Sequence, residues 1–243
     1  MTVIAVSPHL DDAVFSVGGT LARLGADTLV VTCFTGSTDP AVVTPFGLST
    51  QLDKGLAADV DYMALRREED RRALETLGVT GRHLGLLEAP HRGYDSAPEL
   101  FAGRHDDDVV AGPLAEALAP LLADADVVLA PQALGDHVDH QWVSAVVSEL
   151  VDPARVAWWR DTPYVLRRPD AVPMDHVAGR EVAVDVASVL ERKVAAACCY
   201  VTQVPFQFGS DDDAGAALGA APAEVLRAGG IAREVLGGLT RGG

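Results

Sequence analysis

Residues 3–19 read VIAVSPHLDDAVFSVGG, and this stretch decides the fold. Its apolar, β-branched beginning, residues 3–6, is typical of a buried parallel strand, and Pro8 ends the strand because proline cannot donate to a sheet ladder. Val14 and Val17 then recur at helical spacing, which predicts a helix directly afterwards. A strand therefore leads into a helix through a tight turn. In open α/β folds, such a turn at the carboxyl end of a strand is where ligands bind.

The predicted turn contains one histidine and two aspartates. His9 and Asp12 are three residues apart at the helix start, so they can face one point. An imidazole nitrogen and a carboxylate oxygen are good ligands for zinc and other transition metals. Asp11 lies between them and would point elsewhere, beside a metal rather than at it. The alternative is that both aspartates cap the helix and His9 is a polar loop residue.

A second polar cluster follows another apolar strand, residues 126–130. It is the string His-x-Asp-His, which begins at His137 and ends at His140. Because the carboxyl ends of parallel strands share one edge of a sheet, both clusters can meet in one crevice. His9, Asp12 and one of the two later histidines would complete a three-ligand set with an open coordination position, as catalytic zinc requires. Taken alone, the string could be ordinary surface residues.

Strands and helices alternate along the rest of the chain. Further strands are predicted at 27–34, 82–87, 156–159 and 181–184, and further helices at 61–77, 109–123 and 186–199. This order predicts a Rossmann-like, three-layer α/β/α fold with a mostly parallel sheet and the active site at the C-terminal edge of the strands. No linker divides the chain, so we expect residues 1–243 to form one domain. Its C-terminal third, about 151–243, has the weakest pattern, and residues 209–222 are a candidate mobile segment.

Composition limits the classes of partner. The chain has 243 residues, 49% of them hydrophobic, and a net charge of −16, which argues against nucleic acid and anionic membranes. Three cysteines, two of them adjacent, make no disulfide framework. We find no targeting segment and no apolar run of transmembrane length, so we expect a cytoplasmic protein without a membrane partner. Nothing in the sequence indicates an oligomeric state.

The two motifs, in this order, resemble the PIG-L/LmbE-like zinc-dependent N-deacetylases. The first pattern of that family, Pro-His-Pro-Asp-Asp-Glu, stands here as PHLDDA at residues 8–13, and the second, His-x-Asp-His, as HVDH at 137–140. A weaker pattern, Arg-x-x-Glu-x-x-x-Ala-x-x-x-Leu-Gly, fits residues 66–78, so the resemblance covers roughly two thirds of the chain. Leu10 replaces a proline, which should change the stiffness of the turn. Ala13 replaces a glutamate that would support the ligands, so site geometry or metal affinity can differ.

The resemblance implies a role for each motif residue. His9, Asp12 and His140 are expected to bind zinc, or another divalent transition metal. Asp11 is expected to be the general base that takes a proton from the attacking water. His137 is expected to act as an acid or to stabilise the oxyanion.

Three further residues are expected at the site. Asp139 would orient a protonated form of His137. Arg66 and Tyr164 are candidate substrate-binding residues. Two long segments are also expected to contact the substrate, residues 35–59 and 88–104.

We therefore expect a metal-dependent amide hydrolase that removes an N-acyl group, foremost acetyl, from an amino sugar or a sugar-bearing small molecule. Such a molecule would be a thiol-cofactor or natural-product intermediate. Two alternatives stay open. A catalytically silent sugar-binding protein on the same fold is favoured only by Ala13, and a metal-dependent esterase or phosphatase on a similar sheet would use the same ligands.

Overall fold

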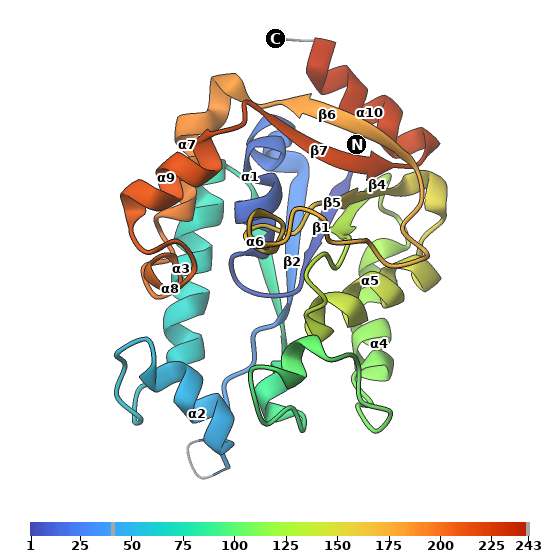
Figure 1. Ribbon diagram of the computed structural model, residues 1–243. Helices are drawn as coiled ribbons and strands as arrows, with labels where there is room; N and C mark the ends of the chain where they lie inside the picture. Colours follow the sequence, from blue (N-terminus) through green and yellow to red (C-terminus); the bar gives the residue numbers. More distant parts are fainter. Residues whose placement is uncertain (40–41, 242–243) are drawn as a thin grey trace.

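The computed structural model describes residues 1–39 and 42–241, and one seven-stranded sheet runs through it (Figure 1). The strands are β1 (Val3–Ser7), β2 (Thr28–Phe34), β3 (Thr80–Leu86), β4 (Val127–Pro131), β5 (Val156–Trp159), β6 (Arg180–Asp185) and β7 (Ala223–Ala228). They lie in the order β3-β2-β1-β4-β5-β7-β6, and β7 runs opposite to the other six strands. The prediction of a mostly parallel sheet is confirmed.

Helices cover both faces of this sheet. They are α1 (Asp12–Leu24), α2 (Pro45–Leu52), α3 (Tyr62–Leu77), α4 (Ala111–Leu122), α5 (Val138–Leu150), α6 (Tyr164–Arg167), α7 (Leu190–Ala197), α8 (Val204–Phe208), α9 (Asp211–Gly219) and α10 (Gly230–Arg241). Alternate strand residues point to opposite faces, so Val3 and Ala5 pack with α1 and α3, whereas Ile4 and Val6 pack with α4 and α5. The result is the predicted three-layer arrangement.

The strand order reverses at the centre of the sheet. β2 and β3 lie on one side of β1, and β4 and β5 lie on the other. Val3 pairs with Val127 and Ala5 with Leu129 in parallel register, so β1 and β4 end at the same edge. In open α/β sheets, a ligand crevice forms at this kind of reversal. Both polar motifs lie at this edge, the first after β1 and the second after β4.

The segments with the weakest sequence pattern differ most from expectation. Within 35–59, where an irregular segment was expected, the structure has α2; residues 40 and 41 of this segment lie outside the described part. Residues 209–222, the candidate mobile segment, include α9, which buries Ala214 and Leu218 in the core. The sequence also gave no signal for β7 and α10. Of the described helices, none combines the length and apolar character that a membrane span needs.

A glycine in α1 marks a tight helix contact beside the sheet. A Cβ added at Gly19 would lie 2.6 Å from Cβ of Val186 and 3.1 Å from Oε1 of Glu224. We expect Gly19→Ala to lower the free energy of unfolding by about 1–3 kcal/mol, since overpacking a buried contact forces neighbours to shift. Denaturant unfolding measures the change. Gly237→Ala is the matched control: nothing lies within 4 Å of its added Cβ, so alanine should raise helix stability slightly. Equal stability of Gly19→Ala and wild type would contradict the prediction.

Candidate active site

Three side chains from the two motifs meet at the sheet edge. Nδ1 of His9 lies 3.2 Å from Oδ2 of Asp12, and Nε2 of His140 lies 3.1 Å from the same oxygen. All three residues are buried, and Nε2 of His140 has no hydrogen-bond partner. The backbone N–H of His9 also donates to this oxygen at 2.8 Å. Ligand atoms from opposite halves of the chain therefore converge on one point.

Each of these imidazoles is held from behind by a carboxylate. Nε2 of His9 is 2.8 Å from Oδ2 of Asp139, and Nδ1 of His140 is 2.7 Å from Oδ1 of Asp161. The other ring nitrogen of each histidine is left facing Asp12. Metal-binding histidines are usually fixed in this way, because a carboxylate on one nitrogen orients the ring and makes the other a better ligand. Two imidazoles and a carboxylate suit zinc, so the residues present fit a zinc ion.

The carboxylate of Asp139 is fixed toward the first motif. It accepts the backbone N–H of Ala89 at 3.1 Å and Nη2 of Arg92 at 2.8 Å, in addition to its contact with His9. The pKa of Asp139 is lowered because these contacts to Arg92 and His9 outweigh its burial. The expectation that its carboxylate orients His137 is wrong, since the hydrogen bonds that hold it direct it to His9 instead.

His137 is oriented by the backbone. Its Nδ1 accepts the backbone N–H of Asp139 at 3.2 Å, so the neutral ring carries its proton on Nε2. Burial and the neighbouring His9 lower the pKa of His137 to about 3. Burial beside another histidine favours the neutral ring, and the protonated form of His137 stays a prediction. The neutral ring still offers one N–H donor. Its ring centroid is 4.9 Å from that of His9, and its ligand atom lies within 4.8 Å of those of His9 and His140.

Asp11 lies in the same turn as His9 and Asp12, and its buried carboxylate is hydrogen-bonded to neither imidazole among the described residues. Burial and the charge of Asp12 raise its pKa, while Arg66 opposes the rise. Nη2 of Arg66 lies 3.7 Å from Oδ2 of Asp11, and its Nη1 donates to Glu88. Arg66 is itself buried, and its Nε has no hydrogen-bond partner. The guanidinium therefore contacts the candidate base directly.

These residues open into a cavity of about 340 Å³. The side chain of Tyr164 covers one side, with its ring centroid 5.2 Å from that of His140. It packs over Gly135, where φ is +97° and a Cβ would lie 2.6 Å from Cβ of Tyr164. Both predicted substrate segments line the cavity, 35–59 through Phe46, Thr50, Asp53 and Lys54, and 88–104 through Glu88, Pro90, Ala97, Leu100 and Phe101. Arg66 lines it too.

Sequence reasoning missed Asp161 and Arg92. Asp161 lies two residues after the end of β5, so the argument that located both motifs at strand ends also applied to it. Arg92 lies in 88–104, a segment that was expected only to contact the substrate. It spans Asp108 and Asp139, which no local pattern predicts.

We expect Asp161→Asn to weaken zinc binding by about 10- to 100-fold, since it removes the charge that holds His140. Competition with a chelator measures the affinity. Asp27→Asn, an exposed residue at the other end of β2, is the control and should bind zinc as wild type does. Unchanged affinity in Asp161→Asn would show that its contact with His140 does not support metal binding.

This chain is similar to several deacetylases in sequence and in fold. The crystal structure of the zinc-inhibited form of teicoplanin deacetylase Orf2 superimposes with a TM-score of 0.77 at 28% identity, over 93% of this chain and 97% of that one. A 2'-N-acetylparomamine deacetylase of Streptomyces fradiae is 36% identical over 214 residues, which are 82% of this chain and 72% of that enzyme.

A second relative and the family itself complete the comparison. A 1D-myo-inositol 2-acetamido-2-deoxy-alpha-D-glucopyranoside deacetylase of Corynebacterium glutamicum is 30% identical over 164 residues, which are 64% of this chain and 54% of that enzyme. The chain thus spans about half the length of that relative. The family described as PIG-L: GlcNAc-PI de-N-acetylase matches residues 4–151, which include both motifs and the ends of β1 and β4. The chain belongs to the PIG-L family of deacetylases.

Proposed function

We propose that this protein is a zinc-dependent hydrolase that removes an N-acyl group, foremost acetyl, from an amino sugar or a sugar-bearing small molecule. The observation that carries the proposal is the pair of histidines, His9 and His140, each backed by a carboxylate and facing Asp12. By name, the similar enzymes described above are deacetylases of 2'-N-acetylparomamine, of a 2-acetamido-2-deoxy-glucopyranoside and of teicoplanin. His9, Asp12 and His140 would hold the metal.

Proton transfer is assigned to Asp11. When bound by the three ligands, zinc lowers the pKa of water towards neutrality and polarises a carbonyl group. Asp11 takes the proton of the water that attacks the acyl carbon. The raised pKa of the buried Asp11 carboxyl supports this assignment, because a general base works best with a pKa near the working pH. Arg66 limits that rise and fixes the carboxylate, besides forming part of the pocket wall.

Two side chains, His137 and Tyr164, would donate hydrogen bonds to the substrate. The Nε2–H of His137 would donate to the oxygen that becomes negative when water adds to the amide. This is the second of the two roles expected for His137, and it needs no charged ring. Burial and nearby aspartates raise the pKa of Tyr164, so its phenol keeps its proton and can donate to the substrate. The C–N bond then breaks, the amine leaves with the proton that Asp11 had taken, and the acid is released.

The test is a zinc assay combined with a substrate panel. Zinc-loaded protein should release acetate from N-acetylated amino sugars, and removal of the metal with a chelator should abolish the release. O-acetylated and phosphorylated sugars, assayed side by side, separate an amidase from an esterase or a phosphatase. Sugar binding without any acetate release would instead support the silent binding protein.

A further inference from the structure

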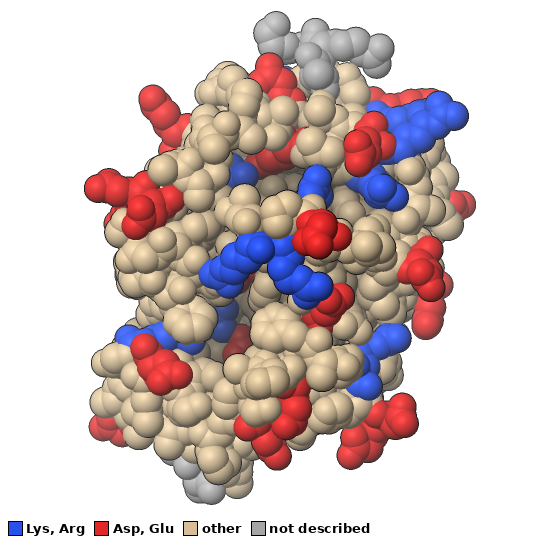
Figure 2. All heavy atoms as spheres, in the orientation of Figure 1, with Lys and Arg blue, Asp and Glu red and all other residues tan. Residues whose placement is uncertain are grey.

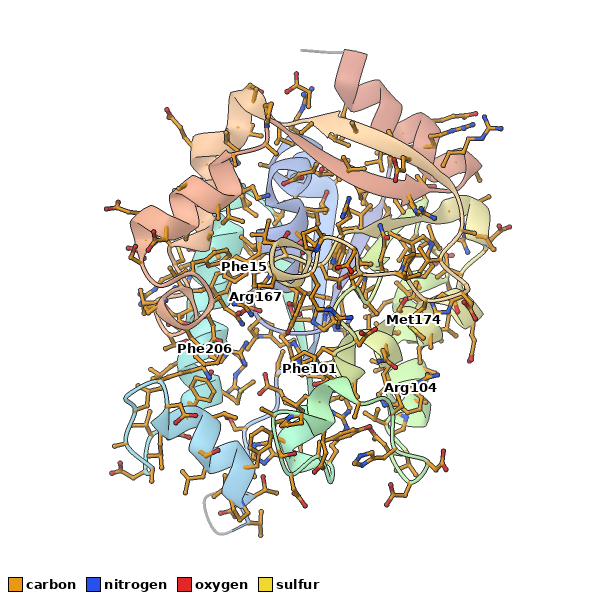
Figure 3. The ribbon with its side chains drawn as sticks, in the orientation of Figure 1. Phe15, Phe101, Arg104, Arg167, Met174 and Phe206 are labelled. Atoms are coloured by element: carbon orange, nitrogen blue, oxygen red, sulfur yellow. The ribbon has the colours of Figure 1, made fainter. Side chains whose placement is uncertain are left out.

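Tyr62 is a buried phenol in the cavity wall that none of the proposed steps uses. It begins α3, is 8% exposed, and lines the cavity together with Gln203, which directly precedes α8. Cζ of Arg66, the side chain that contacts the candidate base, lies 5.5 Å from the Tyr62 ring centroid. Phe206 of α8 lines the cavity as well, and Figure 3 shows Phe101 across the cavity from it. A single side chain therefore separates Tyr62 from the candidate base.

A chain of hydrogen bonds determines how the Tyr62 hydroxyl is used. The carboxylate of Glu69 accepts the hydroxyl proton of Thr202 at 2.7 Å, so Oγ1 of Thr202 can only accept from Gln203, at 3.0 Å. The Gln203 atom at this position must therefore be the amide nitrogen, because the amide oxygen has no proton to donate. The second N–H of the same amide donates to the Tyr62 oxygen at 2.7 Å. Inside the protein, the Tyr62 oxygen is thus an acceptor.

The hydroxyl proton of Tyr62 is left for a ligand. Among residues 1–39 and 42–241, no acceptor for it lies within hydrogen-bond distance. Burial raises the pKa of Tyr62, so the phenol keeps this proton. A buried donor is unfavourable without an acceptor, and a ligand oxygen in the cavity supplies one. The site therefore fits an oxygen acceptor such as a sugar hydroxyl.

The cations near Tyr62 do not give the same selectivity. The face drawn in Figure 2 carries basic side chains across its middle, and Nζ of Lys54 lies 5.5 Å from the Tyr62 ring centroid. An ammonium group on a flexible stem reaches oxygens at many positions. A phenol whose oxygen already accepts one hydrogen bond donates over a narrow range of directions. Discrimination of a single oxygen position therefore depends on Tyr62.

We propose that Tyr62 is a specificity-determining residue, which donates a hydrogen bond to one ring hydroxyl of the acylated amino sugar. The chain through Gln203 and Thr202 orients it for this contact. The inference rests on the proposed deacetylase function and adds a contact that selects among sugars. A site that donates to a substrate hydroxyl discriminates against the analogue that lacks it, because the buried donor then stays without an acceptor.

The experiment compares methyl N-acetyl-β-D-glucosaminide with its 3-deoxy, 4-deoxy and 6-deoxy analogues. Acetate release by zinc-loaded protein gives kcat/KM for each compound. In the wild type, removal of the hydroxyl that Tyr62 contacts should lower kcat/KM about tenfold. In Tyr62→Phe, kcat/KM should fall about tenfold for the parent but stay unchanged for this one analogue, so that the difference between them disappears. A merely structural role of Tyr62 would instead lower kcat/KM for all four compounds by the same factor.

Two further variants test the contact and the chain behind it. Tyr200→Phe is the matched control, because Tyr200 is a buried phenol that donates to Asp70 at 2.7 Å and does not line the cavity. It should leave the preference for the parent unchanged. Thr202→Val removes the acceptor that fixes the Gln203 amide and should weaken the same preference severalfold.

Three results would overturn the inference. The first is a preference for the parent over every analogue that Tyr62→Phe leaves intact, and the second is an equal loss for all four compounds in that variant. The third is an unchanged preference in Thr202→Val, which would show that the chain does not orient the phenol.

Failure of the proposed function gives a different result. If zinc-loaded protein releases acetate from none of the four compounds, the deacetylase assignment to this substrate class fails. Calorimetric binding of the same compounds to wild type and Tyr62→Phe then still decides the contact. Weaker binding of one analogue than of the parent, seen only with the wild type, supports it; the absence of any such difference contradicts it.

Discussion

Asp11→Asn is expected to lower kcat by about 10²- to 10⁴-fold while zinc content stays at the wild-type level. The size follows from the usual contribution of a positioned general base. Asparagine has nearly the same shape but cannot take a proton, and the three proposed ligands are left in place. The side chain is buried beside Asp12 and 3.7 Å from Arg66, so the substitution removes charge and proton acceptance without opening a cavity.

Acetate release and elemental analysis measure the two parts of this prediction. Asp27→Asn serves as the control, because the same chemical change on an exposed residue should alter neither quantity. Wild-type turnover in Asp11→Asn would refute the assignment of the base. Loss of zinc together with activity would instead make Asp11 a residue that supports the metal.

His140→Ala should reduce zinc affinity by more than 100-fold, and turnover should fall with it. Loss of a group that only supports a ligand costs about 10- to 100-fold, so loss of the ligand itself should cost more. The substitution removes the nitrogen that faces Asp12 and leaves the buried carboxylate of Asp161 without its imidazole partner. Some loss of stability is therefore expected as well.

Chelator competition and denaturant unfolding separate these effects. His83→Ala is the matched control: His83 lies on β3, its imidazole contacts Asp70, and it does not line the cavity. The His83→Ala variant should bind zinc with wild-type affinity. A folded His140→Ala protein that binds zinc with wild-type affinity would remove His140 from the ligand set.

The central part of the site could be predicted because it depends on strand ends. Apolar runs before His9 and before His137 are long enough to indicate buried parallel strands, and parallel strands bring their carboxyl ends to one edge. The convergence of His9 and Asp12 with one of the two later histidines follows from that, whereas the choice of His140 came from the resemblance to the family. What the pattern does not contain is the direction of a side chain. Asp139 turns to His9 rather than to His137 because Arg92 and the Ala89 backbone hold it there, and those contacts exist only in the folded chain.

The C-terminal third was harder to predict for a related reason. α9 has a sequence rich in Gly, Ala and Asp, and it is stabilised by burial of Ala214 and Leu218 rather than by its own composition. β7 alternates buried and half-exposed residues, but Arg227 and Glu224 interrupt its apolar pattern. The buried carboxylate of Glu224 forms an ion pair with Nζ of Lys193 and accepts hydrogen bonds from backbone N–H groups of α1. All of these partners are more than 30 residues away in the sequence.

The proposed catalytic residues and the cavity walls come from different parts of the fold, and this separation has an evolutionary consequence. The proposed metal ligands and base lie in the turn after β1 and at the starts of α1 and α5, whereas the cavity walls come from α2, residues 88–104, α6 and α8. Insertions or exchanges in these outer segments can reshape the chamber for a new glycoside while the hydrolytic chemistry is inherited intact. Diversification of substrate within the lineage would then be recorded in the loops, and the sheet would change little.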